Sequence, residues 1–199
     1  MFNVVSSKKH DEFREDVEQM FDRLRIVYGD GAKDDYDHND VIYVLYSHKK
    51  FGVIGSARLI PAGSKALTEE YMRRIKCEGK NKVYELSRVF FHIPQSAKVK
   101  ESSEMLEIIK RDFYLGLYEA LKTISISQKV KTFITVLTEE EHKAILQYGM
   151  WPFQKQGRVM IPKSEAKVYA LGILPMSEPL YETFLTRRQA YESRMQHVF

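Results

Sequence analysis

The run Val83–Phe91 places a carboxylate, a hydroxyl group and a guanidinium group inside a segment that is otherwise apolar and has the pattern of a buried strand. Because successive side chains of a strand point to opposite faces, we expect Glu85 and Ser87 on one face of the sheet and Leu86 and Arg88 on the other. A buried charge without a partner is strongly destabilising, so Glu85 and Arg88 require partners from elsewhere in the chain. On this segment alone, a structural ion pair explains the charges as well as a catalytic site does.

Suitable partners lie at the ends of the two preceding apolar segments. Asp34 and Asp37 are in the loop before a predicted strand at 41–47, and Arg58 lies near the end of a second predicted strand at 51–60. Taken singly, the aspartates are typical of a turn and the arginine of a solvated strand end. Taken together with the run described above, they predict a polar cluster built from three consecutive strands.

The composition is that of an ordinary soluble globular protein. The chain has 199 residues, of which 44% are hydrophobic and 29% are charged, so we expect one domain, 1–199, with its own core. Its one cysteine, Cys77, excludes an internal disulfide and provides no metal site. The first residues lack the apolar core of a signal peptide, and no run approaches the ~20 apolar residues of a membrane span, which predicts a cytoplasmic protein.

The net charge is only slightly positive, with 31 basic against 27 acidic residues. This excess is too small to predict nucleic-acid binding, which uses a concentrated basic face. It does suit an acidic protein partner, because electrostatic steering speeds the encounter of opposite charges. The candidate contact residues are Arg73, Arg74, Lys76, Lys80, Lys82 and Lys143. A solvated charged face is the alternative explanation for each of them.

Apolar periodicity and turn residues predict an alternation of helices and strands. We expect helices at 10–28, 67–75, 103–122, 138–148 and 177–197. We expect strands at 41–47, 51–60, 83–91, 131–137, 159–161 and 168–173. Thr138 and Glu141 have the spacing of a capping box, which marks the start of the fourth helix. This order predicts an α+β fold, an α/β/α sandwich with a mixed central sheet and helices on both faces.

Four short motifs occur in an order that resembles a known family. They are Phe21 followed by Arg23-Leu24, Asp-x-Tyr-Asp at 34–37, Ala-Arg-Leu-Ile-Pro at 57–61 and Glu-Leu-Ser-Arg at 85–88. The set resembles the acyl-homoserine-lactone (autoinducer) synthases and their relatives, the N-acyl amino acid synthases of the long-chain N-acyltyrosine type. The resemblance implies a GNAT-like acyltransferase fold and transfer of a long-chain fatty acyl group from an acyl carrier protein thioester to an amine, with no bound cofactor and no metal.

Two positions depart from the autoinducer synthases. Those enzymes carry an arginine four residues before the phenylalanine that matches Phe21, and a tryptophan shortly after it, which help to form the S-adenosylmethionine pocket. Here the first position is Val17 and the second falls within 25–28. The departure favours the N-acyl amino acid synthases, whose acceptor is an amino acid such as tyrosine. A lactone synthase that uses S-adenosylmethionine is the alternative.

The resemblance also assigns roles to the polar cluster. The family's acidic pair, its first core arginine and its Glu and Arg fall on Asp34, Asp37, Arg58, Glu85 and Arg88. We expect Glu85 to take the proton of the attacking amine and Ser87 to polarise the thioester carbonyl. The two arginines suit the carboxylate of the acceptor. Phe21 and Thr135 complete the predicted substrate-binding set.

In the implied fold, the strands at 83–91 and 131–137 part to admit the pantetheine arm of the thioester. Acetyl-coenzyme A members of the fold carry a glycine-rich loop after the first of these strands, whereas 91–98 lack glycine. This favours an acyl carrier protein as donor and partner, with Arg73, Arg74 and Lys143 among its contacts. The acyl chain needs an apolar tunnel, and its candidate walls are Phe90, Phe91, Phe113, Leu117, Phe133, Val136, Trp151 and Phe153. Ordinary core packing is the alternative for these side chains.

Two other functions fit the same residues. A noncatalytic module could keep this fold and bind an acyl carrier or a regulatory partner, in which case the charges form only a buried ion network. A small-molecule acetyltransferase would use acetyl-coenzyme A in place of a carrier thioester. Replacement of Glu85 tests the first alternative, and a comparison of the two donors tests the second.

Overall fold

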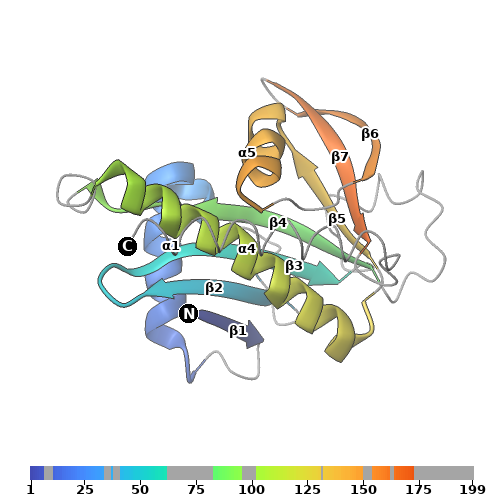
Figure 1. Cartoon of the computed structure of the whole chain (residues 1–199). Coiled ribbons are helices and arrows are strands. Elements are labelled where there is room, and N and C mark those ends of the chain that lie inside the picture. Colours follow the sequence, from blue (N-terminus) through green and yellow to red (C-terminus); the bar gives the residue numbers. More distant parts are fainter. Residues whose placement is uncertain are drawn as a thin grey trace, which may run out of the picture.

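The computed structural model describes residues 1–6, 11–33, 37, 41–61, 83–95, 102–130, 132–149, 154–161 and 164–172. These residues form a seven-stranded sheet in the order β1-β2-β3-β4-β5-β7-β6 (Figure 1). The strands are β1 (Phe2–Ser6), β2 (Ile42–His48), β3 (Gly52–Pro61), β4 (Val83–Phe91), β5 (Thr132–Leu137), β6 (Gln154–Ile161) and β7 (Ser164–Gly172). The helices are α1 (Arg14–Tyr28), the short 3-10 helix η2 (Gly29–Ala32), α4 (Ser103–Gln128) and α5 (Glu139–Gly149). The predicted α+β fold with a mixed sheet is confirmed, since β4 and β5 are parallel and all other neighbours are antiparallel.

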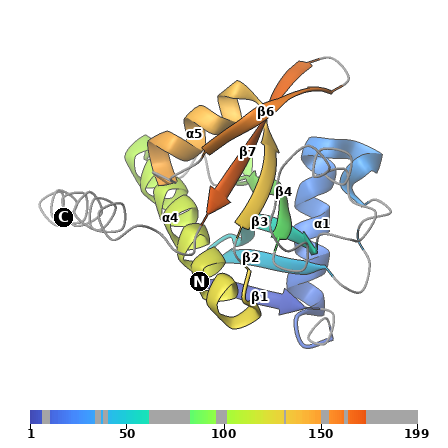
Figure 2. The same ribbon diagram turned by 90° about the vertical axis from the view of Figure 1, so that its right-hand side faces the viewer.

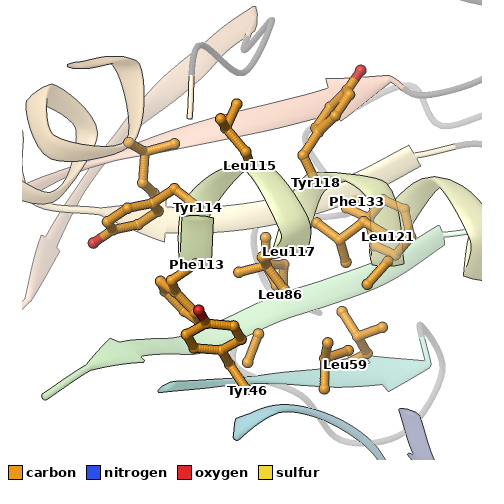
Figure 3. Close-up of a cluster of buried hydrophobic side chains, with 14 of the residues drawn as sticks. Tyr46, Leu59, Leu86, Phe113, Tyr114, Leu115, Leu117, Tyr118, Leu121 and Phe133 are labelled. Carbon is orange, nitrogen blue, oxygen red and sulfur yellow. The ribbon is translucent and has the colours of Figure 1, made fainter. Parts of the chain in front are cut away.

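The sheet separates two hydrophobic layers, with α1 on one face and α4 on the other (Figure 2). In the first layer Met20 of α1 packs in one cluster with Tyr43 of β2. In the second layer Leu117 of α4 packs in one cluster with Leu86 of β4, as Figure 3 shows. Because strand side chains alternate, Tyr43 and its neighbour Val44 belong to different layers. The layer of a strand residue therefore tells which helix covers it.

The predicted helices and strands that fall within the described residues, from α1 to α5, begin close to their expected positions. The capping box at the start of α5 is also confirmed. The Thr138 amide donates to Glu141 Oε2 at 2.7 Å, and the Glu141 amide donates to the Thr138 hydroxyl at 3.2 Å. Among the described helices, none combines the length and the apolar character needed to cross a membrane. The predicted helices at 67–75 and 177–197 lie outside the described residues.

The sequence does not predict strand β1, which forms an edge of the sheet by pairing with β2. The strand has five residues, and only Val5 among them is fully buried, so its alternation is a weak signal. Its Phe2 ring lies 4.7 Å from the ring of Tyr46 and 6.1 Å from that of Phe113, measured between centroids. These partners come from β2 and α4, so contacts distant in sequence stabilise β1.

Helix α4 continues to Gln128, beyond its predicted end at 122. The added turn contains Ile and Ser, which are mediocre helix formers. Ile124 and Ser125 are buried there, and the Ser125 hydroxyl donates to the Val130 carbonyl oxygen at 2.5 Å. Burial against the rest of the core therefore extends the helix further than local preference predicts. Strands β6 and β7 are likewise longer than the predicted 159–161 and 168–173.

Strands β4 and β5 pair only at their beginnings. The parallel ladder joins Val83 to Thr132, Tyr84 to Phe133 and Glu85 to Ile134. On its other side, β4 stays paired with β3 as far as Phe91. Figure 1 shows β4 and β5 together at one end and separated at the other. The predicted parting of these two strands is thus confirmed, and it begins directly after Glu85.

Gly55→Ala should destabilise the protein by about 1–3 kcal/mol, because overpacking a filled core carries that cost. A Cβ at Gly55 would lie 2.5 Å from a ring atom of Phe113, which is fully buried. Gly31→Ala is the matched control, since a Cβ there meets no atom within 4 Å. Urea unfolding of both variants measures the difference. Equal stability of the two variants would contradict the tight contact of Phe113 with β3.

Candidate active site

Strand β4 contains a bulge at Arg88. Two residues of β4, 88 and 89, lie opposite the single β3 residue 57, and Arg88 has a φ of 49°. A left-handed residue in such a bulge inserts one position into the strand and reverses the alternation of the residues that follow. Arg88 therefore lies on the same face as Ser87. The prediction that it shares the face of Leu86 is wrong, because strict alternation holds only for a regular strand.

A row of polar side chains crosses three strands on the face covered by α1. Tyr43 of β2 pairs with Arg58 of β3, which pairs with Ser87 of β4. Arg58 donates from Nε to Ser87 Oγ and from Nη1 to Asp37 Oδ1, both at 3.1 Å. The Tyr43 hydroxyl donates to the same Asp37 oxygen at 2.7 Å. We call Asp37, Tyr43, Arg58 and Ser87 the Asp37–Arg58 network.

The ion pair at the centre of this network is fully buried. The side chains of Arg58 and Asp37 are 4% and 1% exposed. Burial, and then the hydrogen bond to the Asp37 carboxylate, raise the pKa of Tyr43 well above its usual value. The Tyr43 hydroxyl therefore keeps its proton and acts as a donor to Asp37. The structure thus brings together Asp37, Arg58 and Ser87, which the sequence predicts as one cluster.

Tyr43→Phe should destabilise the protein by about 1–3 kcal/mol, since it removes one donor from a buried carboxylate. Tyr46→Phe is the control, because Tyr46 is also a buried tyrosine of β2 but lies on the opposite face of the sheet. Urea unfolding compares the two variants, and a similar loss in both would contradict a specific role of Tyr43 in holding Asp37.

Arg88 connects the same face of β4 to the end of α1. Its guanidinium donates to the Gly31 carbonyl oxygen at 2.7 Å and to the Ala32 carbonyl oxygen. It also lies over the Tyr28 ring, 5.8 Å from the centroid. Arg88 thereby holds η2 against the bulge. Both Arg58 and Arg88 already donate to groups of the protein, so their binding of an acceptor carboxylate stays a prediction.

Glu85 lies where β4 and β5 begin to part. It is 7% exposed and is the last β4 residue paired with β5. Across the β3–β4 ladder it faces Ile60, which belongs to the layer under α1, so Glu85 shares the face of Ser87. The carboxylate therefore lies beside the Asp37–Arg58 network. It is also next to the part of β4 that is no longer paired with β5. A carboxylate in this position suits proton exchange with a group bound between the strands.

Phe21 of α1 packs against the Asp37–Arg58 network through the ring of Tyr43. Its ring meets the Tyr43 ring edge-on, with centroids 5.9 Å apart and planes at 79°. Val17 packs against the same layer, at the position where the autoinducer synthases carry an arginine. This side of α1 therefore stabilises the network by apolar contact, and Phe21 acts through Tyr43.

Most of the other predicted residues lie on the face of the sheet that α4 covers. Thr135 is buried on β5, on the side of Phe133, which belongs to the layer under α4. Phe90 belongs to the layer under α1, whereas the next residue, Phe91, packs against the layer under α4. Phe90 and Phe91 therefore lie on opposite faces of β4, and their part in one acyl tunnel stays a prediction. The remaining described wall residues on the α4 side are Phe113, Leu117 and Phe133.

Some predicted residues fall outside the described part of the chain. They are Asp34, Arg73, Arg74, Lys76, Lys80, Lys82, Trp151 and Phe153. Of the predicted carrier-protein contacts, the structure places Lys143, whose side chain is exposed on α5 and lies 3.8 Å from Glu139. Val136 is only partly buried on β5.

Sequence reasoning does not single out Tyr43 or Tyr28, although both contact the polar cluster. Tyr43 lies within a predicted strand, where an aromatic residue is ordinary. Its pairing with Arg58 follows from the β2–β3 register, and the contact of Tyr28 with Arg88 follows from the bulge. The only sequence signal for the contact between Tyr43 and Arg58 is that the two residues lie on the consecutive strands of one predicted hairpin.

No protein-family model and no curated protein matches the chain. Solved structures do match it. A CoA-dependent acyl-homoserine lactone synthase, MesI, superposes with a TM-score of 0.66 at 17% identity, over 96% of this chain and 95% of that chain. The chain has the fold of these acyltransferases. The AHL synthase LasI gives a TM-score of 0.62 at 16% identity over 87% and 89% of the two chains. An aminoglycoside 6'-acetyltransferase type Ii gives 0.57 at 12% identity over 88% and 99%.

Proposed function

We propose that the protein transfers a fatty acyl group from a thioester to the α-amino group of an amino acid. The observation that carries this proposal is the parting of β4 from β5 directly after Glu85, beside the Asp37–Arg58 network. A thioester arm inserted at this parting would bring its carbonyl group to the face that carries Glu85 and Ser87. The GNAT-like fold, which acyl-homoserine lactone synthases share, supports this use of the parting.

The reaction needs an uncharged amine and a polarised carbonyl group. The uncharged amine nitrogen attacks the thioester carbon, and Glu85 takes the proton that this nitrogen loses as the C–N bond forms. The Ser87 hydroxyl, oriented by the hydrogen bond it accepts from Arg58, can donate to the carbonyl oxygen as negative charge develops there. The new C–N bond forms and the C–S bond breaks. The leaving thiolate takes up the proton that Glu85 received, so the protein returns to its starting state.

The acceptor that we propose is an amino acid such as tyrosine. Binding of its carboxylate by Arg58 and Arg88 would require these groups to add a contact to those they make with Asp37, Ser87 and η2. A guanidinium group has five N–H donors, so an additional contact is chemically feasible. The aromatic ring of Tyr28, which is exposed in part, lies beside Arg88.

The donor that we propose is an acyl carrier protein. The segment after β4 lacks the glycines that hold coenzyme A pyrophosphate in acetyltransferases, and Lys143 offers an exposed cation to an acidic partner. MesI, by contrast, is described as CoA-dependent. Parallel assays with acyl carrier protein and coenzyme A thioesters of the same acyl group decide between these donors.

Lactone synthesis from S-adenosylmethionine is the second candidate, and the similarity of the fold to MesI and LasI favours it. Val17 packs in an apolar layer, at the position where the resemblance to the autoinducer synthases implies an arginine for this acceptor. We therefore prefer the amino acid acceptor.

In the decisive experiment, the purified protein receives each of the two thioester donors in turn. Each donor is combined either with a panel of amino acids or with S-adenosylmethionine. Thiol release measures turnover and mass spectrometry identifies the product. We expect an N-acyl amino acid. A lactone would establish the second candidate, and an N-acetylated product that forms only with acetyl-coenzyme A as donor would establish a small-molecule acetyltransferase. Absence of turnover with every pair would contradict an enzymatic function.

A further inference from the structure

A row of aromatic rings crosses the region where β4 and β5 part, on the side covered by α4. The Phe91 ring at the end of β4 lies 5.3 Å from the Phe113 ring of α4, measured between centroids. Phe113 lies 5.0 Å from Tyr114, and Tyr114 lies 6.0 Å from Tyr148 of α5. We call these four residues the aromatic wall. It extends from the end of β4 that is not paired with β5, through α4, to the helix that follows β5.

Phe113 is the fixed part of this wall. It is fully buried, and its ring rests on the backbone of Gly55, where a Cβ would lie 2.5 Å from it. Leu117 and Phe133 of the same cluster are also fully buried. Protein interiors are close-packed, so an acyl chain cannot pass through these side chains without displacing them. Phe113 cannot retreat into the sheet, because the β3 backbone lies directly beneath it.

Tyr114 is the part of the wall at its edge. It is 9% exposed, and in Figure 3 its ring points sideways from α4, whereas Phe113 points onto the sheet beside Tyr46. Burial, and then the Glu141 carboxylate, raise the pKa of Tyr114 to about 12, so its hydroxyl stays neutral. The Tyr114 ring meets the Phe113 ring edge-on, with planes at 65°, and stacks on the Tyr148 ring of α5, with planes at 15°. Shortening this side chain would therefore open room without moving the sheet.

We propose that Tyr114 limits the length of the acyl group that the protein accepts. This inference rests on the proposed function, because it concerns the donor of that reaction. The thioester carbonyl would lie on the face of Glu85, and the attached chain would reach the α4 side through the parting of β4 and β5. There it meets the aromatic wall. The acyl group is apolar, since the surrounding cluster consists of apolar and aromatic side chains.

The test compares Tyr114→Ala with Tyr114→Phe and Tyr46→Ala. Tyr46 is a matched control, because it is a buried tyrosine that also contacts Phe113, at 5.8 Å, but it lies on β2, away from the parting. The measured quantity is the ratio of kcat/KM between successive donors, from butanoyl to hexadecanoyl thioesters. This ratio does not depend on the fraction of folded enzyme, so partial destabilisation of a variant does not affect it.

Tyr114→Ala should shift the preferred donor to a longer chain, with a gain of about tenfold or more in the ratio for a donor two methylenes longer than the wild-type optimum. Tyr114→Phe and Tyr46→Ala should keep the wild-type preference. Turnover with an unchanged preference in Tyr114→Ala would overturn the inference, as would an equal shift in Tyr46→Ala. Absence of turnover in the wild-type protein with any donor would instead overturn the proposed function, and this inference with it.

Discussion

Glu85→Gln should lower the rate of acyl transfer by about 10²- to 10⁴-fold while the protein stays folded, because a general base contributes a factor of that size. The amide has nearly the shape of the carboxylate but cannot accept the proton of the amine. Glu85 also lies at the point where β4 and β5 part, so its carboxylate is next to the proposed position of the thioester. Thiol release at saturating acceptor, together with urea unfolding, measures both effects.

Glu119→Gln is the control for this prediction. Glu119 lies on α4, where it pairs with Lys122 at 3.9 Å, and its replacement should leave turnover unchanged. If Glu85→Gln kept the wild-type rate, another group would have to take the amine proton. If the wild-type protein bound an acyl carrier protein but showed no turnover, this result would support the noncatalytic module.

Arg58→Ala should destabilise the protein by about 3–5 kcal/mol, because removal of one partner of a buried ion pair carries a cost of that size. The Asp37 side chain is 1% exposed. Of the hydrogen bonds that Asp37 accepts from Arg58 and Tyr43, the variant keeps only the one from the Tyr43 hydroxyl. The same variant also removes the donor to Ser87. Urea unfolding monitored by circular dichroism measures the loss.

Arg25→Ala is the matched control. Arg25 and Asp22 form an ion pair of 2.6 Å, but their side chains are 64% and 69% exposed, so its loss should cost roughly 1 kcal/mol or less. Arg58→Met combined with Asp37→Leu should recover much of the stability, since it removes both charges together. Recovery should be incomplete, because the Tyr43 hydroxyl loses its acceptor. An equal effect of Arg58→Ala and Arg25→Ala would contradict the burial of the network.

Local patterns in the sequence predict most of the described elements correctly. The apolar spacing of α1, the capping box at Thr138 and the apolar run of β4 each depend on residues close together in the chain. Such signals fail where distant contacts decide. Strand β1 depends on β2 and α4, and the last turn of α4 depends on burial of Ile124.

The sequence by itself determined which charges must find partners, because Glu85 and Arg88 occur in a segment too apolar to leave them in solvent. It also determined that β4 follows a helix and a hairpin in a mixed sheet. Only the tertiary structure decided how the charges are shared. The bulge turned Arg88 toward η2, and the β2–β3 register placed Tyr43 beside Arg58. The physical reason is that a single inserted residue, or a shift of one position in register, changes the face of every side chain beyond it, and local preferences do not encode either event.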